Sequence, residues 1–396
     1  MHNLRHLNRV TTGLSYLLQR DRVWGQPVFF TIETINTCNF RCIYCPQSDQ
    51  ANHFVNGRGV MSFEQFKHII ANLRSCFDVR IVSLHRDGEP LLNKRLEAYI
   101  EHLTELGIYV TVSSNCSLLS EERSHRLIEA GLRMVGTDFC ADAALYERLR
   151  VRGVWAETLD GIRHLLRAGV QLGADFRVVI KDMATHGVPP KDAEALMERT
   201  RGLFGDWADR VTVMPVYFHN ALGESLVNLS KGPDAPERTL YTLCHQPWVN
   251  FTIDFHGRVV GCCRDLRSEY VLGSLLEQSA DAIWNGERML NLRRALIEKR
   301  PQEIGICKAC DVPGKGRTPA GLPWRRSGTS SSPAPGADSI GDDGPVCAEV
   351  AYCECRHPGL AGTMPPGRDR RCFGLRQRRT ASVRRHGPDL GIRAGR

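Results

Sequence analysis

The stretch TCNFRCIYCPQ, residues 37–47, places three cysteines in the spacing Cys-x3-Cys-x2-Cys directly after a Val/Ile/Phe-rich segment. Three thiolates on one short loop can hold three irons of a [4Fe–4S] cluster and leave the fourth iron open to a small chelating molecule. The alternative is a zinc ion bound by Cys38, Cys42, Cys45 and a fourth ligand from elsewhere. The position of the loop, after a strand and before a repeat of strands and helices, favours the cluster.

Around this loop, six short β-rich segments alternate with amphipathic helical segments between residues 28 and 217. The units average about 32 residues, as right-handed βαβ repeats do. The strands are apolar, which is typical of a parallel sheet buried on both faces. Because eight units are needed to close a barrel, the predicted fold class is α/β, a partial (β/α)6 TIM-like barrel. The predicted strands are Val28–Ile35, Val79–Leu84, Ile108–Ser113, Arg133–Asp138, Phe176–Ile180 and Val211–Val216, and the predicted helices are Phe63–Leu73, Lys94–Leu106, Glu121–Ala130, Trp155–Ala168 and Lys191–Leu203.

A second set of cysteines follows residue 243. Cys244 and Cys262 flank a predicted β-hairpin in the spacing Cys-x12-Gly-x4-Cys, and Cys307 and Cys310 form a later Cys-x2-Cys pair. Four thiolates complete a second [4Fe–4S] site that has no open iron. A zinc ribbon is the alternative for two cysteine pairs around a hairpin. The predicted elements of this part are the strands Trp248–Asp254 and Arg258–Gly261, joined by a turn with Gly257, and the helix Ala280–Lys299.

The basic charge of the chain is confined to its last part. The whole chain carries a net charge of +8, and residues 314–396 alone contain 15 Lys and Arg against 7 Asp and Glu. The preceding part is therefore neutral, which argues against a nucleic-acid partner for the folded body. Gly and Pro make up 23 of the last 83 residues, a composition typical of disordered segments. We expect a disordered basic tail.

Nothing in the sequence predicts export or insertion into a membrane. No run of about 18 or more apolar residues occurs, and the first twenty residues lack the apolar core of a secretory signal. We therefore expect a cytoplasmic protein without a membrane partner. Its fifteen cysteines then indicate metal binding more strongly than a disulfide framework.

The cysteine loop resembles that of the radical S-adenosylmethionine (SAM) superfamily, in which an aromatic residue precedes the third cysteine, as Tyr44 does here. The resemblance covers residues 26–217. After the second predicted strand, Asp87-Gly88-Glu89-Pro90 resembles the Gly-Gly-Glu-Pro segment that holds the SAM amino group, with Asp in place of the first Gly. Polar residues on strands three and five resemble further SAM contacts: Ser113, Ser114, Asn115 and Arg177.

The resemblance implies a chemistry and its cofactors. In this superfamily a [4Fe–4S] cluster supplies an electron that cleaves SAM, and a 5′-deoxyadenosyl radical removes hydrogen from an unactivated C–H bond. The second cysteine set resembles the auxiliary SPASM module in its short, one-cluster form, the twitch domain. The expected cofactors are therefore two [4Fe–4S] clusters and SAM, with flavodoxin or ferredoxin as the electron donor.

These motifs divide the chain into five expected parts. They are an N-terminal leader segment, a radical SAM partial barrel, a linker, a twitch/SPASM auxiliary domain and the tail, at residues 1–25, 26–217, 218–243, 244–313 and 314–396. The four cysteines of the tail are not counted as ligands, because they do not follow the Cys-x2-Cys pair promptly.

Further residues are candidates for chemistry. Cys263 directly follows a predicted cluster ligand and faces the other side of its strand, so we expect it to return a hydrogen atom to a substrate radical. A buried structural role or cluster ligation are the alternatives for Cys263, and Cys116 and Cys140 are rival thiols. Asp138 can bind a substrate amine or hydroxyl or cap the next helix, and His85 can accept a proton or be a core residue.

The length and cysteine layout resemble radical SAM enzymes of aminoglycoside biosynthesis, which implies an aminosugar or aminoglycoside substrate. Two reactions fit this layout. An epimerase returns hydrogen from a thiol to the opposite face of a sugar carbon, and a dehydrogenase oxidises a secondary alcohol of an aminocyclitol to a ketone. The spare thiol of Cys263 favours the epimerase. Peptide modification is disfavoured by the short segment before the first strand, and a structural metal-binding module does not explain the DGEP segment.

Overall fold

The computed structural model describes residues 2–49, 53–216, 241–308 and 310. The predicted tail, residues 314–396, lies outside the described residues, and only residues 241–243 of the predicted linker are described. In the described part of the chain, no helix is long and apolar enough to cross a membrane.

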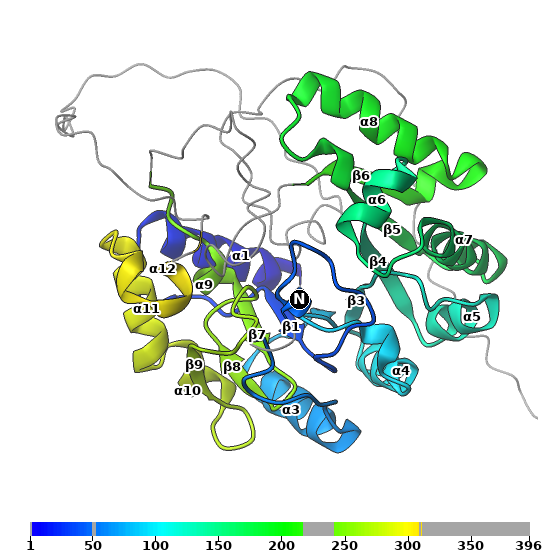
Figure 1. The fold of residues 1–396 in the computed structure, drawn as a ribbon. Coiled ribbons are helices and arrows are strands. Elements are labelled where there is room, and N and C mark those ends of the chain that lie inside the picture. Colours follow the sequence, from blue (N-terminus) through cyan, green and yellow to red (C-terminus); the bar gives the residue numbers. More distant parts are fainter. Residues whose placement is uncertain (1, 50–52, 217–240, 309, 311–396) are drawn as a thin grey trace, which may run out of the picture. The chain divides into compact units, whose positions relative to one another are not determined.

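Six parallel strands form one continuous part of the sheet. The order across the whole sheet is β6-β5-β4-β3-β2-β1-β7-β8-β9, so the first six strands lie in sequence order and β6 is an edge (Figure 1). Each of the six predicted strands is present, which confirms the partial (β/α)6 architecture. Their bounds are β1 Phe29–Ile32, β2 Ile81–Ser83, β3 Tyr109–Ser113, β4 Leu132–Phe139, β5 Arg177–Asp182 and β6 Val211–Pro215.

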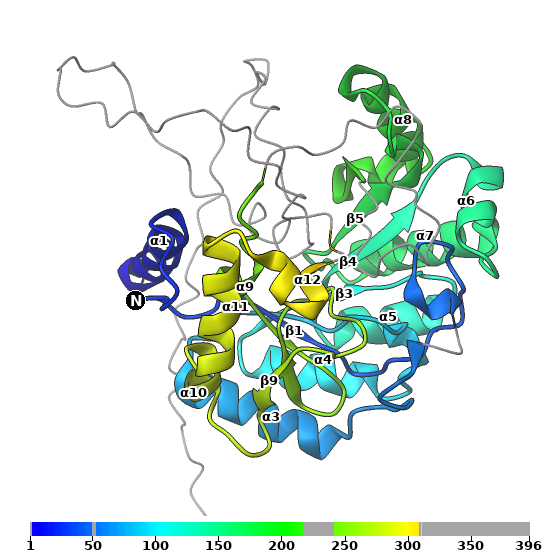
Figure 2. The ribbon, with the colours of Figure 1, turned by 60° about the vertical axis from the view of Figure 1, so that its left-hand side comes forward.

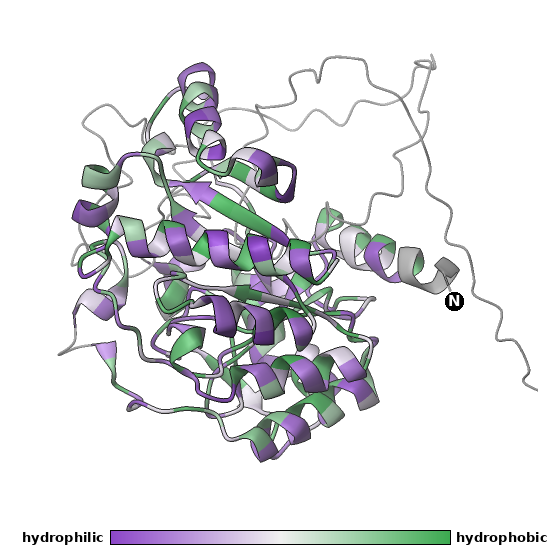
Figure 3. Cartoon of the chain, turned by 90° about the vertical axis from the view of Figure 1, so that its right-hand side faces the viewer, coloured by the Kyte–Doolittle hydropathy of each residue, from purple (hydrophilic) through white to green (hydrophobic). Residues whose placement is uncertain are grey.

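The helices between these strands begin at polar caps. Ser62 and Gln65 form a capping box at the start of the first of them, and the side chains of Ser120 and Asp142 cap two others. Hydrophilic and hydrophobic residues alternate along the helices (Figure 3), as expected for helices that pack one face against a sheet and expose the other face to solvent. The five predicted helices are present, with α6 in addition: α3 Phe63–Cys76, α4 Leu96–Glu105, α5 Glu121–Glu129, α6 Ala143–Leu149, α7 Trp155–Gln171 and α8 Pro190–Gly202.

The C-terminal hairpin extends the same sheet. Strand β7 (Asn250–Ile253) pairs in parallel with β1, from Phe29↔Asn250 to Ile32↔Ile253. Strand β8 (Arg258–Val260) is antiparallel to β7, and β9 (Val271–Ser274), which the sequence did not predict, is antiparallel to β8. The hairpin flanked by Cys244 and Cys262 is therefore paired, through β7, with the strand that leads into the three-cysteine loop.

Two predictions about this C-terminal part are wrong in detail. Trp248 lies in a short helix, α9 (Gln246–Val249), before β7 begins. The single helix predicted over Ala280–Lys299 is two helices, α10 (Ala280–Trp284) and α11 (Glu287–Ile297), because Gly286 has extended backbone at the start of α11. Helix α10 contacts α3, and α11 contacts α9 (Figure 2).

Helix α1 (His2–Leu17) occupies the predicted leader segment and has an unusual polarity. Its buried face is polar: Thr12 donates to the Gln26 carbonyl at 3.1 Å, and the Trp24 amide donates to the Ser15 hydroxyl at 3.0 Å. Its exposed face is apolar and includes Leu7, Val10, Leu14 and Leu17. These hydrogen bonds, together with the ring contact between Tyr16 and the buried Trp248, hold α1 to the rest of the chain.

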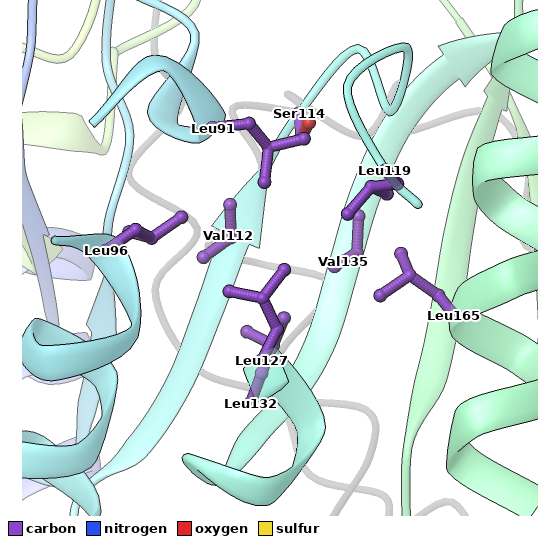
Figure 4. Close-up of a pocket in the computed structure, with 9 residues that line it drawn as sticks. All are labelled: Leu91, Leu96, Val112, Ser114, Leu119, Leu127, Leu132, Val135 and Leu165. Atoms are coloured by element: carbon purple, nitrogen blue, oxygen red, sulfur yellow. The ribbon is translucent and has the colours of Figure 1, made fainter. Parts of the chain in front are cut away.

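A small cavity in the core lies between β3, β4 and the helices that cover them (Figure 4). Ser114 is the only polar residue in its lining, and the other lining residues are apolar: Leu91, Leu96, Val112, Leu119, Leu127, Leu132, Val135 and Leu165. A charged cofactor would lose its hydration there without gaining polar partners. The cavity is therefore part of the core and not a cofactor site.

Candidate functional site

The three-cysteine loop leaves the carboxyl end of β1 and is held by backbone hydrogen bonds to the end of α6. The Arg41 and Ile43 amides donate to the carbonyls of Val151 and Leu149 at 2.9 and 3.0 Å. The Cys45 amide donates to the Cys42 carbonyl at 3.0 Å. The carboxyl ends of parallel strands are where (β/α) barrels place their chemistry. The loop thus lies at the functional edge of the sheet.

The three thiols of this loop fit the ligand set of a [4Fe–4S] cluster. Burial is the largest cause that raises the pKa of Cys38, to about 12, and it also raises the pKa values of Cys42 and Cys45. The thiols lie close enough that each charge raises a neighbour's pKa. Because iron binds thiolates, loading the cluster releases these protons. Among the described residues, no three His, Cys, Asp or Glu side chains form a site for a single metal ion.

Gly88 and Glu89 connect the end of β2 to this loop. The Glu89 amide donates to the Thr37 carbonyl at 2.8 Å, next to Cys38. At Gly88 a side chain would have its Cβ 2.3 Å from the Ile35 carbonyl oxygen, so only glycine allows this approach. Pro90 follows as the buried first residue of a 3-10 turn. The DGEP segment therefore packs directly on the backbone that leads into the cysteine loop.

The Glu89 carboxylate organises the end of β3. It accepts hydrogen bonds from the Ser114 hydroxyl at 2.8 Å, the Asn115 amide at 2.7 Å and the Leu91 amide at 3.0 Å. Burial raises the pKa of Glu89, although these hydrogen bonds oppose the rise. Ser113 ends β3 and is half-buried. Glu89 thus holds two strand ends in one arrangement.

Asn115 lies beside the first cysteine. Its Nδ2 donates to Oδ1 of Asn39 at 2.8 Å and lies 4.0 Å from the Cys38 sulfur. The Ser117 amide donates to the Asn115 side-chain oxygen at 3.0 Å. The structure therefore brings together the predicted positions on the cysteine loop, the DGEP segment and the end of β3.

Asp87, where the chain departs from the Gly-Gly-Glu-Pro pattern, has buried partners of its own. Its Oδ2 pairs with Nε2 of His53 and accepts a hydrogen bond from Nε2 of Gln47 at 3.2 Å. After burial, the charge of Asp87 is the largest cause that raises the pKa of Cys45. The sequence did not reveal His53 or Gln47, because no local pattern relates them to Asp87.

A cluster of polar side chains surrounds Asp138 at the end of β4. Oδ1 of Asp138 lies 3.2 Å from Nζ of Lys181, and Oδ2 lies 3.2 Å from both Nη1 of Arg150 and the Tyr44 hydroxyl. Burial raises the pKa of Asp138, but Lys181 and Arg150 lower it more, and the result lies below the ordinary value. The cluster thus joins the residue before the third cysteine to β4 and β5.

His85 lies near the same cluster. Its Nδ1 is 2.8 Å from the Ser83 hydroxyl. Burial first, and then the positive charge of Lys181, lower the pKa of His85 to about 4. At neutral pH the ring is therefore uncharged, and the same shift makes it a weak proton acceptor.

Arg177, by contrast, does not reach this edge of the sheet. It begins β5, opposite Met134, whereas Lys181 and Asp182 end the strand. Its side chain is exposed, and its guanidinium donates to the Asp209 carbonyl at 3.4 Å. The strand starts at Arg177 and continues for five residues toward the functional edge, so the structure does not bring Arg177 together with the other predicted SAM contacts.

The second cysteine set also comes together. Burial, and then the charges of Cys262 and Cys310, raise the pKa of the Cys307 thiol. The pKa of Tyr241 is raised by burial and then by the charges of Cys244 and Cys307, so this hydroxyl lies near both. These charge interactions link Cys307 to Cys262 and Cys310, and link Tyr241 to Cys244 and Cys307. Four thiolates are the ligand set of a fully ligated cluster.

The three remaining candidate thiols differ in exposure. The Cys263 sulfur is half-buried, 3.8 Å from Oε1 of Gln246, which precedes β7. Cys116 and Cys140 are fully buried, and their thiols lie 3.7 and 3.3 Å from the carbonyls of Ser114 and Asp142. Burial raises the pKa of both thiols to about 12. Cys263 is thus the most accessible of the three.

Comparison with known protein families agrees with this geometry. Residues 32–199 match the Radical SAM superfamily, and residues 244–311 match the SPASM iron–sulfur cluster-binding domain. The first match contains the cysteine loop, the DGEP segment and the Asp138 cluster. The second contains Cys244, Cys262, Cys307 and Cys310.

Individual relatives differ in how much of the chain they cover. A SAM-dependent 2-deoxy-scyllo-inosamine dehydrogenase of Niallia circulans is 24% identical over 285 residues, which cover 71% of this chain and 91% of that enzyme. GTP 3′,8-cyclases of Gloeobacter violaceus and Xanthomonas axonopodis are 28% and 30% identical over 144 and 187 residues, and the match covers 44% and 53% of their lengths. The chain thus spans about half of these two relatives.

One solved structure supports the fold. The structure of anSMEcpe with bound AdoMet matches with a TM-score of 0.52 and 13% sequence identity, and covers 72% of this chain and 86% of that one.

Proposed function

We propose that this protein is a radical SAM dehydrogenase that oxidises a secondary alcohol of an aminocyclitol. The chain matches a radical SAM domain followed by a SPASM domain. The observation that carries this proposal is the match to a SAM-dependent 2-deoxy-scyllo-inosamine dehydrogenase, which covers 71% of this chain and 91% of that enzyme. The matches to GTP cyclases cover about half of those proteins. The sequence favoured an epimerase over a dehydrogenase, and this match reverses that preference.

The two cysteine sets and the SAM-contact residues would hold the cofactors. Cys38, Cys42 and Cys45 would bind the SAM cluster. The second cluster would be bound by Cys244, Cys262, Cys307 and Cys310. When bound, these groups supply a 5′-deoxyadenosyl radical that removes one hydrogen atom and an acceptor for one electron. The protein itself must bind the substrate, take up the hydroxyl proton and exclude other hydrogen donors. An external one-electron donor such as flavodoxin or ferredoxin completes the cycle.

The Asp138 cluster supports an aminocyclitol as the substrate. Asp138 is a carboxylate whose pKa is lowered, so it stays ionised at neutral pH and can pair with a substrate ammonium or hydroxyl group. Arg150 and Lys181 on its two oxygens can donate hydrogen bonds to the other hydroxyls. His85 is uncharged at neutral pH, so its ring nitrogens can form hydrogen bonds with a substrate hydroxyl group.

An epimerase is the second candidate, and one observation favours it. Cys263 provides a half-buried thiol next to a predicted auxiliary ligand. In an epimerase this thiol would return a hydrogen atom to the carbon from which one was removed. In a dehydrogenase the same thiol would have no part in the reaction.

Product analysis in D2O separates the two reactions. Anaerobically reconstituted enzyme is incubated with a panel of aminocyclitols and aminoglycosides, and the product masses are read. The dehydrogenase predicts a product two mass units lighter than the substrate, with full turnover in Cys263→Ala. A product of altered retention time that gains one deuterium, and that Cys263→Ala fails to release, would establish the epimerase instead. Cys140→Ala is the matched control for loss of a thiol.

A further inference from the structure

Arg86 is a buried cation that touches both functional parts of the chain. It directly precedes the DGEP segment at the carboxyl end of β2, and its side chain is 2% exposed. On one side, its Nη2 lies 3.1 Å from Oε2 of Glu33, which follows β1 and is fully buried. On the other side, it contacts the loop between β8 and β9. The guanidinium thus lies between the SAM-contact segment and the auxiliary region.

The contacts on the auxiliary side fall within the loop that begins at Cys262. Arg86 donates to the Asp265 carbonyl through Nη1 and to the Ser268 hydroxyl through Nη2, the latter at 3.1 Å. The Asp265 amide donates to the Cys262 carbonyl at 3.1 Å, and the Arg264 amide donates to the Cys262 sulfur at 3.3 Å. One hydrogen bond therefore separates the Arg86 contact from a predicted cluster ligand.

The loop has little freedom to move independently of these contacts. The Asp265 carboxylate accepts hydrogen bonds from the amides of Glu269 and Tyr270 at 2.8 and 2.9 Å, which closes the loop on itself. Asp265 and Ser268 are both buried. A loop closed in this way moves as a unit, so a shift at Cys262 is transmitted to the carbonyl that Arg86 holds.

The carboxylate of Glu33 forms a second bridge between the same two parts. It accepts the Asp87 amide at 3.3 Å and the Phe255 amide, in the turn between β7 and β8, at 3.2 Å. Asn56, between the cysteine loop and α3, also pairs with the Arg267 carbonyl through its side chain and with Arg258 at 3.2 Å. A fully buried ion pair is costly where apolar residues would serve, and specifying one arrangement is the best-attested role of such groups.

We propose that Arg86 is a positioning residue that couples SAM binding to the auxiliary cluster. Filling the auxiliary site fixes the position of Cys262, and the closed loop that follows Cys262 then holds Arg86, and with it the DGEP segment, in the geometry that binds SAM. By linkage, bound SAM then favours the ordered auxiliary site by the same factor. The proposal rests on the two cofactor sites and does not depend on the substrate or on which reaction the enzyme performs.

A double-mutant cycle tests this coupling. The dissociation constant of SAM is measured by equilibrium dialysis for the wild type, Arg86→Lys, Cys307→Ala and the double variant, all with the first cluster reconstituted. Lysine keeps the positive charge beside Glu33 but lacks the planar guanidinium, whose several N–H groups reach Glu33 and the Cys262 loop at the same time. We expect Cys307→Ala to weaken SAM binding about ten-fold in the wild-type background and less than two-fold in the Arg86→Lys background.

A spectroscopic readout guards against a purely structural effect. In the wild type, adding SAM should change the EPR spectrum of the auxiliary cluster, and in Arg86→Lys it should not. Arg293→Gln is the matched control: this arginine is fully buried in α11 and contacts Asp21 and Pro247, not the Cys262 loop. It should lower stability while leaving the coupling intact. Equal effects of Cys307→Ala in both Arg86 backgrounds, or an unchanged spectral response in Arg86→Lys, would overturn the proposal.

Discussion

Replacing Gly88 by alanine should displace the start of the cysteine loop. The new Cβ would stand 2.3 Å from the Ile35 carbonyl oxygen and 2.8 Å from the Thr37 nitrogen, where ordinary contacts begin at 3.4 Å. The neighbouring atoms belong to backbone, so no side chain can rotate away. The two segments must therefore separate by about 1 Å, and overpacking of this kind typically costs ~1–3 kcal/mol.

The displacement falls next to Cys38 and on the hydrogen bond from the Glu89 amide to the Thr37 carbonyl. We therefore expect Gly88→Ala to lose both stability and SAM affinity. Urea unfolding measures the first, and iron content and equilibrium dialysis with SAM measure the second. A loss of stability of ~2 kcal/mol, with SAM affinity reduced at least ten-fold, is the expected outcome.

Gly202→Ala provides the matched control for this substitution. Gly202 ends α8, and a Cβ there would have nothing within 4 Å, so its unfolding free energy should change by no more than ~0.5 kcal/mol. If Gly88→Ala matched Gly202→Ala in stability, iron content and SAM affinity, the close approach between the DGEP segment and the cysteine loop would not matter for binding.

Three further changes test separate parts of the account. Alanine at Cys38, Cys42 or Cys45 should abolish SAM cleavage and leave the auxiliary cluster, since the two sets lie on separate elements; 5′-deoxyadenosine from the triple variant under reductant would refute the assignment. Truncation after Pro313 should preserve cluster loading and SAM cleavage, because the removed residues have too little apolar content to offset ordering entropy; loss of soluble, loaded protein would refute this. Asp138→Asn should lower the unfolding free energy at pH 7 by ~3 kcal/mol, because it removes the carboxylate that pairs with the buried Arg150 and with the partly exposed Lys181. The pKa of Asp138 lies below its ordinary value in the folded state, so its stabilisation is complete above the unfolded pKa and is lost as the pH falls through the folded one. In urea unfolding, the difference between wild type and variant should be constant from pH 7 to pH 5 and shrink below about pH 4; a difference that does not change with pH would contradict the ion pairs.

Features encoded by local pattern were predictable from the sequence. The six strands are apolar and bounded by amphipathic helices, so the partial barrel follows from the alternation alone. The three-cysteine loop and Glu89 were predictable because short spacings carry them. The structure adds that Glu89 holds three hydrogen-bond donors from two segments, which no spacing encodes.

Features that depend on where an element starts or breaks were not predictable. Arg177 and Lys181 lie on the same strand, and only the register against β4 shows that Lys181 is the one beside Asp138. The break at Gly286 interrupts an otherwise continuous helical pattern of apolar residues. Both differences concern a few residues, yet the first changes which cation lies beside Asp138.

Contacts between distant segments were also beyond the sequence. Asp87 departs from the Gly-Gly-Glu-Pro pattern, and no local pattern indicates its partner. In the structure its carboxylate pairs with buried His53, and its charge raises the pKa of Cys45. Arg86 and Asp265 are far apart in the chain, and neither belongs to a motif. Such pairs are set by the packing of β2 against β1 and by the hairpin that continues the sheet.

The most direct test of the proposed dehydrogenase follows one hydrogen atom. An aminocyclitol that is deuterated at the carbinol carbon is incubated anaerobically with the fully reconstituted enzyme, SAM and reductant, and both products are analysed by mass spectrometry. For the dehydrogenase we expect one deuterium in 5′-deoxyadenosine for each ketone formed, and a ketone that carries no label at the oxidised carbon. Deuterium that stays on an alcohol product or passes to solvent, or a ketone formed without 5′-deoxyadenosine, would contradict it.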